Sequence, residues 1–207
     1  MEYTKEYIAD LLIDGGESLL DAFSNNELVK QIPCIKGLIA LGQDARSYID
    51  KREQKKLVEF LMNCNSLSAE QISNFLAKHA ENKEKTGERI LDSVLAMNQP
   101  EKAILAGKLY DKVAARGTDF DDYFRLAQII QNCYYEDLKY LFRFEDGKEF
   151  PNSGDGISKL AVNNLYHLGL LRISHDLDGA GASIPVEAFE CEGYFINEYG
   201  KLIRDSL

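Results

Sequence analysis

Apolar residues recur at helical spacing through most of the chain. Ile90, Leu91 and Val94, for example, fall on one face of a helix predicted over residues 83–97. Comparable stretches cover residues 2–23, 28–64, 68–79, 101–115, 119–130 and 135–144. The pattern therefore predicts a mainly α protein whose residues 1–144 form a helical bundle with short connections.

Capping residues indicate where several of these helices begin and end. Ser68 followed by Gln71 has the spacing of a capping box. Pro100 suits the first turn of a helix, and Gly117 is a typical residue to end one. Thr118 or Asp119 can then cap the next helix.

The pattern changes after residue 144. Residues 145–156 are dense in glycine, proline, aspartate and asparagine, which predicts a linker. A helix over 157–168, two short β-type runs at 170–174 and 193–197 and a final helical stretch follow. We interpret residues 157–207 as a small winged-helix-like α+β module.

Charge argues against the usual role of such a module, which is to read DNA. Besides its one cation, Lys159, the predicted groove helix offers Asn163, Asn164 and His167, and the wing carries Asp176 and Asp178. Residues 157–207 hold four basic and seven acidic side chains, a balance of −3. Because phosphate contacts need several Lys or Arg residues, these five residues are better candidates for docking a protein partner, and nucleic acid is not the favoured ligand.

A basic, apolar stretch near the N-terminus allows a second function. Residues 28–42 could form an amphipathic helix that lies on a membrane. Its candidate contact residues are Ile32, Ile35, Lys36, Leu38 and Ile39. The alternative is a core helix whose basic side faces the acidic residues of 1–27, and this alternative is favoured because amphipathic helices mostly face a protein core.

No motif in the sequence indicates an enzyme. The chain contains no GxSxG, HExxH, Walker-type or GxGxxG pattern, and its three histidines lack neighbours at metal-ligand spacing. Asp119, Asp121 and Asp122 stand at a predicted helix start, where carboxylates cap and favour the helix dipole. The four cysteines lie far apart. We expect no catalytic residue, no metal and no cofactor.

Composition is that of an ordinary globular chain. The 207 residues are 45% apolar and 28% charged, with a net charge of −10 that opposes attraction to nucleic acid and anionic lipid. No stretch is apolar over the roughly 20 residues that span a bilayer, and the first residues do not resemble a signal peptide. A cytoplasmic location is the resulting expectation.

The order of several segments resembles a known group of bacterial proteins. The segments are Ile-Pro-Cys-Ile-Lys-Gly-Leu-Ile (32–39), residues 46–57, Pro-Glu-Lys-Ala-Ile-Leu-Ala-Gly-Lys-Leu-Tyr (100–110), Phe-Arg-Leu-Ala-Gln-Ile-Ile (124–130) and Asp-Leu-Lys-Tyr-Leu (137–141). In this order the chain resembles uncharacterised bacterial helical proteins, which are similar in layout to the abortive-infection alpha group and have a winged-helix-like end. The resemblance implies a bacterial protein associated with phage defence and brings no catalytic residue with it.

These observations favour a non-enzymatic adaptor that binds a protein partner or copies of itself. Two alternatives remain. One is a defence effector that acts on a membrane through residues 28–42, and the other is a DNA-binding regulator that dimerises to assemble a basic face.

Overall fold

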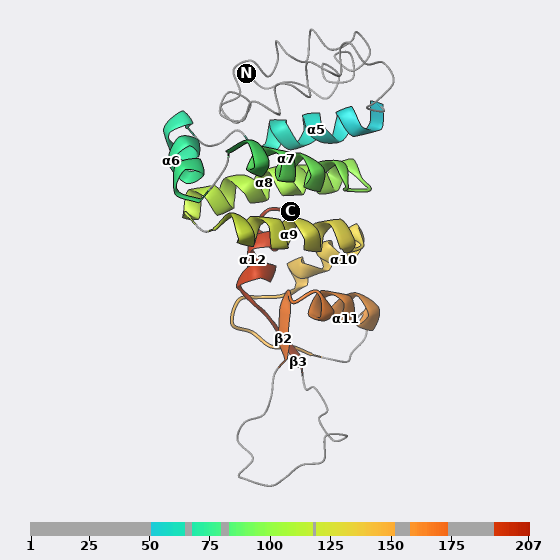
Figure 1. Ribbon diagram of the computed structural model, residues 1–207. Helices are drawn as coiled ribbons and strands as arrows, with labels where there is room; N and C mark the ends of the chain where they lie inside the picture. The colour runs from blue at the N-terminus through green and yellow to red at the C-terminus, as the bar shows by residue number, and fades with distance from the viewer. Residues whose placement is uncertain (1–50, 65–67, 80–82, 118, 152–157, 174–192) are drawn as a thin grey trace. The chain divides into compact units, whose positions relative to one another are not determined.

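The structure is a computed structural model that describes residues 51–64, 68–79, 83–117, 119–151, 158–173 and 193–207 (Figure 1). The helix expected over 28–42 and the wing expected between the last two strands therefore lie outside the described residues. The chain divides into two compact units, Met1–Gln131 and Asn132–Leu207, called here the N-terminal and C-terminal units. The described part is mainly helical with one small sheet, which confirms the predicted fold class.

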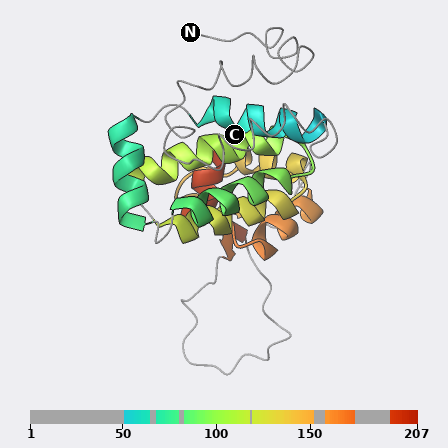
Figure 2. The same cartoon turned by 45° about the horizontal axis from the view of Figure 1, so that its top comes forward.

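The described part of the N-terminal unit is entirely helical. Its elements are α5 (Lys51–Asn63), α6 (Ala69–His79), α7 (Lys83–Leu95), α8 (Pro100–Arg116) and α9 (Phe120–Asn132). Helix α8 packs against both α5 and α6, and α5 also packs against α7. In Figures 1 and 2, α6 lies across one end of α8.

The helix ends follow the capping residues of the sequence. The Ser68 amide donates to Oε1 of Gln71 at 2.9 Å, and the Gln71 amide donates back to the Ser68 hydroxyl at 3.3 Å, which confirms the capping box. Pro100 occupies the first turn of α8, and Gly117 ends that helix with φ of 65°. Asp119 accepts from the Asp121 amide at 3.3 Å, as expected of a cap.

Aromatic rings fill the middle of this unit. Tyr110 of α8 packs edge-on against Phe60 of α5 and Tyr123 of α9, with ring centroids 6.4 and 5.6 Å apart, and all three rings are inaccessible to solvent. Gly107 lets α8 approach α5 closely, because a Cβ there would lie 2.5 Å from the Phe60 carbonyl oxygen. The core of the unit thus depends on one small residue beside several large ones.

Two basic side chains of α5 bind the end of α7. The Lys56 ammonium donates to the carbonyls of Leu95 and Met97, the latter at 2.9 Å, and Arg52 donates to the carbonyl of Asn98. A helix C-terminus presents unpaired carbonyls and partial negative charge, so cations stabilise it. Lys56 and Arg52 therefore stabilise the fold itself.

The C-terminal unit combines short helices with a small sheet. Its elements are α10 (Tyr135–Lys139), the 3-10 helix η1 (Tyr140–Arg143), β1 (Phe150–Pro151), α11 (Lys159–His167), β2 (Leu171–Ile173), β3 (Gly193–Ile196) and α12 (Glu198–Arg204). The strands form an antiparallel sheet in the order β1-β3-β2. Tyr194 stands opposite Phe150 on one side and Ile173 on the other.

The predicted boundary at 145–156 has to be corrected in two ways. The two units divide at Gln131, so α10 and η1 belong with the C-terminal module and not with the bundle. Polar contacts hold them there, because Asp137 binds Asn164 and the Phe144 carbonyl binds Arg204. In addition, the predicted linker contains β1, which pairs with β3.

Asn197 joins the end of β3 to the start of α12. Its side chain accepts from the Gly200 amide at 3.0 Å and thereby caps α12, while its Nδ2 donates to the Gly169 carbonyl at 2.7 Å. A Cβ at Gly200 would lie 2.3 Å from the Leu170 carbonyl oxygen, so only glycine fits without a shift. The Asn-Glu-Tyr-Gly sequence is therefore a structural corner of the unit.

Candidate interaction surface

Helix α11, which carries three of the predicted docking residues, is held against α10 and η1 at two points. Near its start, the Ser158 amide donates to the Tyr140 hydroxyl at 2.8 Å, while the Ser158 hydroxyl caps the helix by accepting from the Ala161 amide. Further along the helix, Asn164 donates to the Asp137 carboxylate at 2.8 Å. These contacts fix which face of α11 turns outward.

The inward face of α11 is apolar and the outward face is mixed. Ala161, Val162 and Leu165 are buried. Leu160 and Asn163 are exposed and lie three positions apart, which places them on one side of the helix. The exposed first turn of α11 therefore offers a leucine beside one cation, Lys159, whereas phosphate contacts need several cations.

The predicted docking residues do not all share this face. Asn163 and His167 are exposed, four positions apart, although Asn163 also accepts a hydrogen bond from the Tyr194 hydroxyl at 3.2 Å. Asn164 is half-buried, and its amide is used to bind Asp137. Its partial burial and its bond to Asp137 therefore distinguish Asn164 from the other two.

The remaining predicted residues cannot be placed. Asp176 and Asp178 of the wing lie outside the described residues. The same holds for Ile32, Ile35, Lys36, Leu38 and Ile39 of the predicted amphipathic helix.

Sequence reasoning missed a set of exposed apolar side chains. Among side chains that the structure describes, the large hydrophobic ones that are exposed are Tyr134 (63%), Phe142 (62%), Leu160 (72%) and Tyr199 (37%). All four belong to the C-terminal unit. Aromatic clustering at 134–144 was a signal for the first two, but sequence alone did not separate exposed rings from packed ones.

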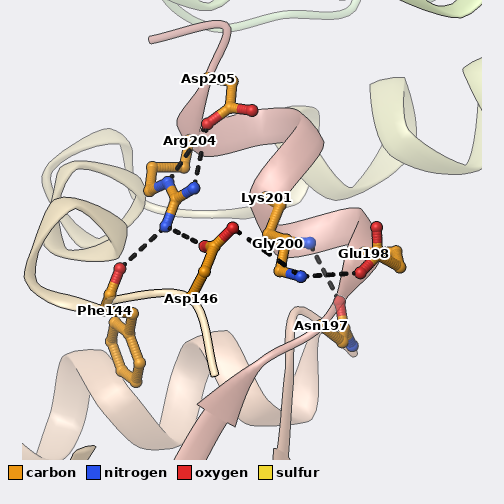
Figure 3. Close-up of polar contacts among 8 residues, drawn as sticks. All are labelled: Phe144, Asp146, Asn197, Glu198, Gly200, Lys201, Arg204 and Asp205. Atoms are coloured by element: carbon orange, nitrogen blue, oxygen red, sulfur yellow. Dashed lines mark hydrogen bonds and ion pairs between the residues drawn. The ribbon is translucent and has the colours of Figure 1, made fainter. Parts of the chain in front are cut away.

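The basic residues of α12 are engaged within the unit (Figure 3). Arg204 donates to the Phe144 carbonyl at 2.9 Å and contacts the carboxylates of Asp146 at 2.8 Å and Asp205 at 3.2 Å. Burial alone would lower the pKa of Arg204, but the hydrogen bonds and charges of Asp146 and Asp205 outweigh it and raise that pKa. The positive charge of Arg204 is therefore compensated by the carboxylates of its neighbours.

The positive charge of Lys201 is compensated in the same way. Its ammonium lies 2.8 Å from the Glu198 carboxylate and 3.9 Å from that of Asp146. The hydrogen bond to Glu198 raises the pKa of Lys201. Of the other cations in residues 157–207, Arg172 lies over the Phe195 ring, 5.0 Å from its centroid, and Lys159 is exposed at the start of α11.

The described residues offer little material for other kinds of site. No group of three or more His, Cys, Asp or Glu side chains among them is arranged to hold a metal ion. Within the same residues, none of the helices combines the length and apolar character that a membrane crossing requires. Comparisons with protein families, curated proteins and solved structures found nothing that matches the chain.

Proposed function

We propose that the protein is a non-enzymatic adaptor that binds a protein partner, or copies of itself, through its C-terminal unit. The observation that carries the proposal is the exposure of Tyr134, Phe142, Leu160 and Tyr199. Large apolar side chains in water favour association, because covering them removes apolar surface from solvent. Tyrosine and phenylalanine are also enriched at the centres of protein interfaces.

Electrostatics favours a protein ligand over nucleic acid. We interpret the C-terminal unit as winged-helix-like, with α11 in the position of the groove helix and β2 and β3 as the strands of the wing. Lys201 and Arg204 are already paired with carboxylates, and the first exposed turn of α11 presents Leu160. Phosphate would have to compete with these carboxylates for both cations.

A substitution of Leu160 tests the proposal with little risk to folding. Leu160→Asp removes the most exposed of the four apolar side chains and places a carboxylate in the first turn of α11, where the helix dipole favours it. Gln128→Asp is the matched control, because it adds the same charge at an exposed position of α9 in the N-terminal unit. Phe142→Asp serves as a second test variant on η1.

The assay is affinity capture of the tagged full-length chain from bacterial cells after nuclease treatment, with and without phage challenge. We expect a defined protein, or an untagged copy of the chain, to be recovered with the wild type and with Gln128→Asp. Its recovery should fall at least tenfold with Leu160→Asp or Phe142→Asp. Equal recovery with all four proteins would overturn the proposal. So would a parallel capture without nuclease treatment that recovers nucleic acid and no protein.

We also propose that the interaction belongs to a bacterial phage-defence pathway. The support is the resemblance in segment order to the abortive-infection alpha group. A plaque assay on cells that carry the wild type or Leu160→Asp tests this second part. If docking drives defence, the wild type should lower plaque numbers and the variant should not.

A further inference from the structure

No further inference is drawn: the strongest candidate, the exposed apolar side chains of Phe142 on η1 and Leu160 on the first turn of α11, belongs to the surface already proposed for docking, and nothing in the structure shows what covers them.

Discussion

Raising the pH should destabilise the N-terminal unit, because three ionisable side chains of its core are held neutral by folding. Cys64, Tyr110 and Tyr123 are inaccessible to solvent. Burial raises the pKa of each above its ordinary value of 9.0 for the thiol and 10.0 for the phenols. Neighbouring negative charge adds to the effect, from Asp111 on Cys64 and from an ionised Cys64 on Tyr123.

The sign and size of the effect follow from proton linkage. A group whose pKa is raised by folding stabilises the folded chain fully below its unfolded pKa, and this stability is lost as the pH rises towards the folded pKa. Within that window each group lowers the free energy of unfolding by about 1.4 kcal/mol per pH unit. The loss due to Cys64 begins above pH 9.0 and the loss due to the two tyrosines above pH 10.0. Together the three groups should lower the free energy of unfolding by about 4 kcal/mol per pH unit.

Lys56 acts in the opposite direction over a narrower range. Burial lowers the pKa of its ammonium from 10.5, so the unfolded chain binds the proton more tightly than the folded one. Between the folded pKa and pH 10.5, this group makes the free energy of unfolding rise with pH. The net loss should therefore be steepest above pH 10.5.

Urea unfolding followed by far-UV circular dichroism, under reducing conditions between pH 8 and pH 12, measures this slope. Tyr123→Phe removes one of the three groups and should reduce the slope above pH 10.0 by about 1.4 kcal/mol per pH unit. Tyr134→Phe is the control, because it removes the same hydroxyl group from a ring that is 63% exposed. Equal slopes for the wild type and Tyr123→Phe would refute the reasoning.

Four further substitutions test the packing, capping and ion-pair contacts. Gly107→Ala places a Cβ 2.5 Å from the Phe60 carbonyl oxygen. The overpacking should cost about 1–3 kcal/mol, which exceeds the gain in helix propensity, so the thermal midpoint should fall. An unchanged midpoint would contradict the close approach of α8 to α5. Ser68→Ala removes the cap of α6 and should cost about 1 kcal/mol, seen as faster amide exchange confined to that helix; unchanged exchange would count against the capping box. Arg204→Ala should lower the free energy of unfolding in urea by about 1–2 kcal/mol, which is more than Asp146→Ala should. The reason is that Arg204 also binds a backbone carbonyl, whereas Asp146 is 57% exposed. A larger loss with Asp146→Ala would contradict the role given to Arg204.

Local signals account for most of what the sequence predicted about the fold. Ser68, Pro100 and Gly117 act within one helical turn of their own positions, so their roles could be inferred without knowledge of the tertiary structure. The strands near 171–173 and 193–196 were likewise marked by short β-type runs. The C-terminal helix was predicted from the spacing of its apolar residues, and α12 occupies that position.

The unit boundary could not be predicted in this way, because long-range contacts determine it. The density of loop-forming residues in 145–156 suggested a linker. The segment nevertheless includes β1, whose partner strand begins at Gly193. Similarly, nothing local to residues 135–144 indicates that Asp137 binds Asn164 or that Phe144 binds Arg204.

The difference between local signals and long-range contacts also explains why the sequence did not reveal the exposed apolar residues of the candidate surface. Leu160, Ala161 and Leu165 are all apolar residues of the helix predicted over 157–168. Only the packing of α11 against its neighbours decides that Ala161 and Leu165 are buried while Leu160 is 72% exposed. Sequence reasoning therefore selected the polar residues Asn163 and Asn164, and one of these turned out to bind Asp137.

The exposed apolar residues and the ion-paired cations of the C-terminal unit together support a protein ligand more strongly than either feature does alone. A few apolar side chains are exposed on most proteins and need no partner. In the C-terminal unit, however, the exposed first turn of α11 presents Leu160 beside a single cation, Lys159, whereas phosphate contacts need several cations. The cations of α12, Lys201 and Arg204, are at the same time held by carboxylates of their own unit. The proposed ligand, which covers Leu160 without taking these cations from their partners, would have the chemistry of a protein surface, and Leu160→Asp tests that proposal directly.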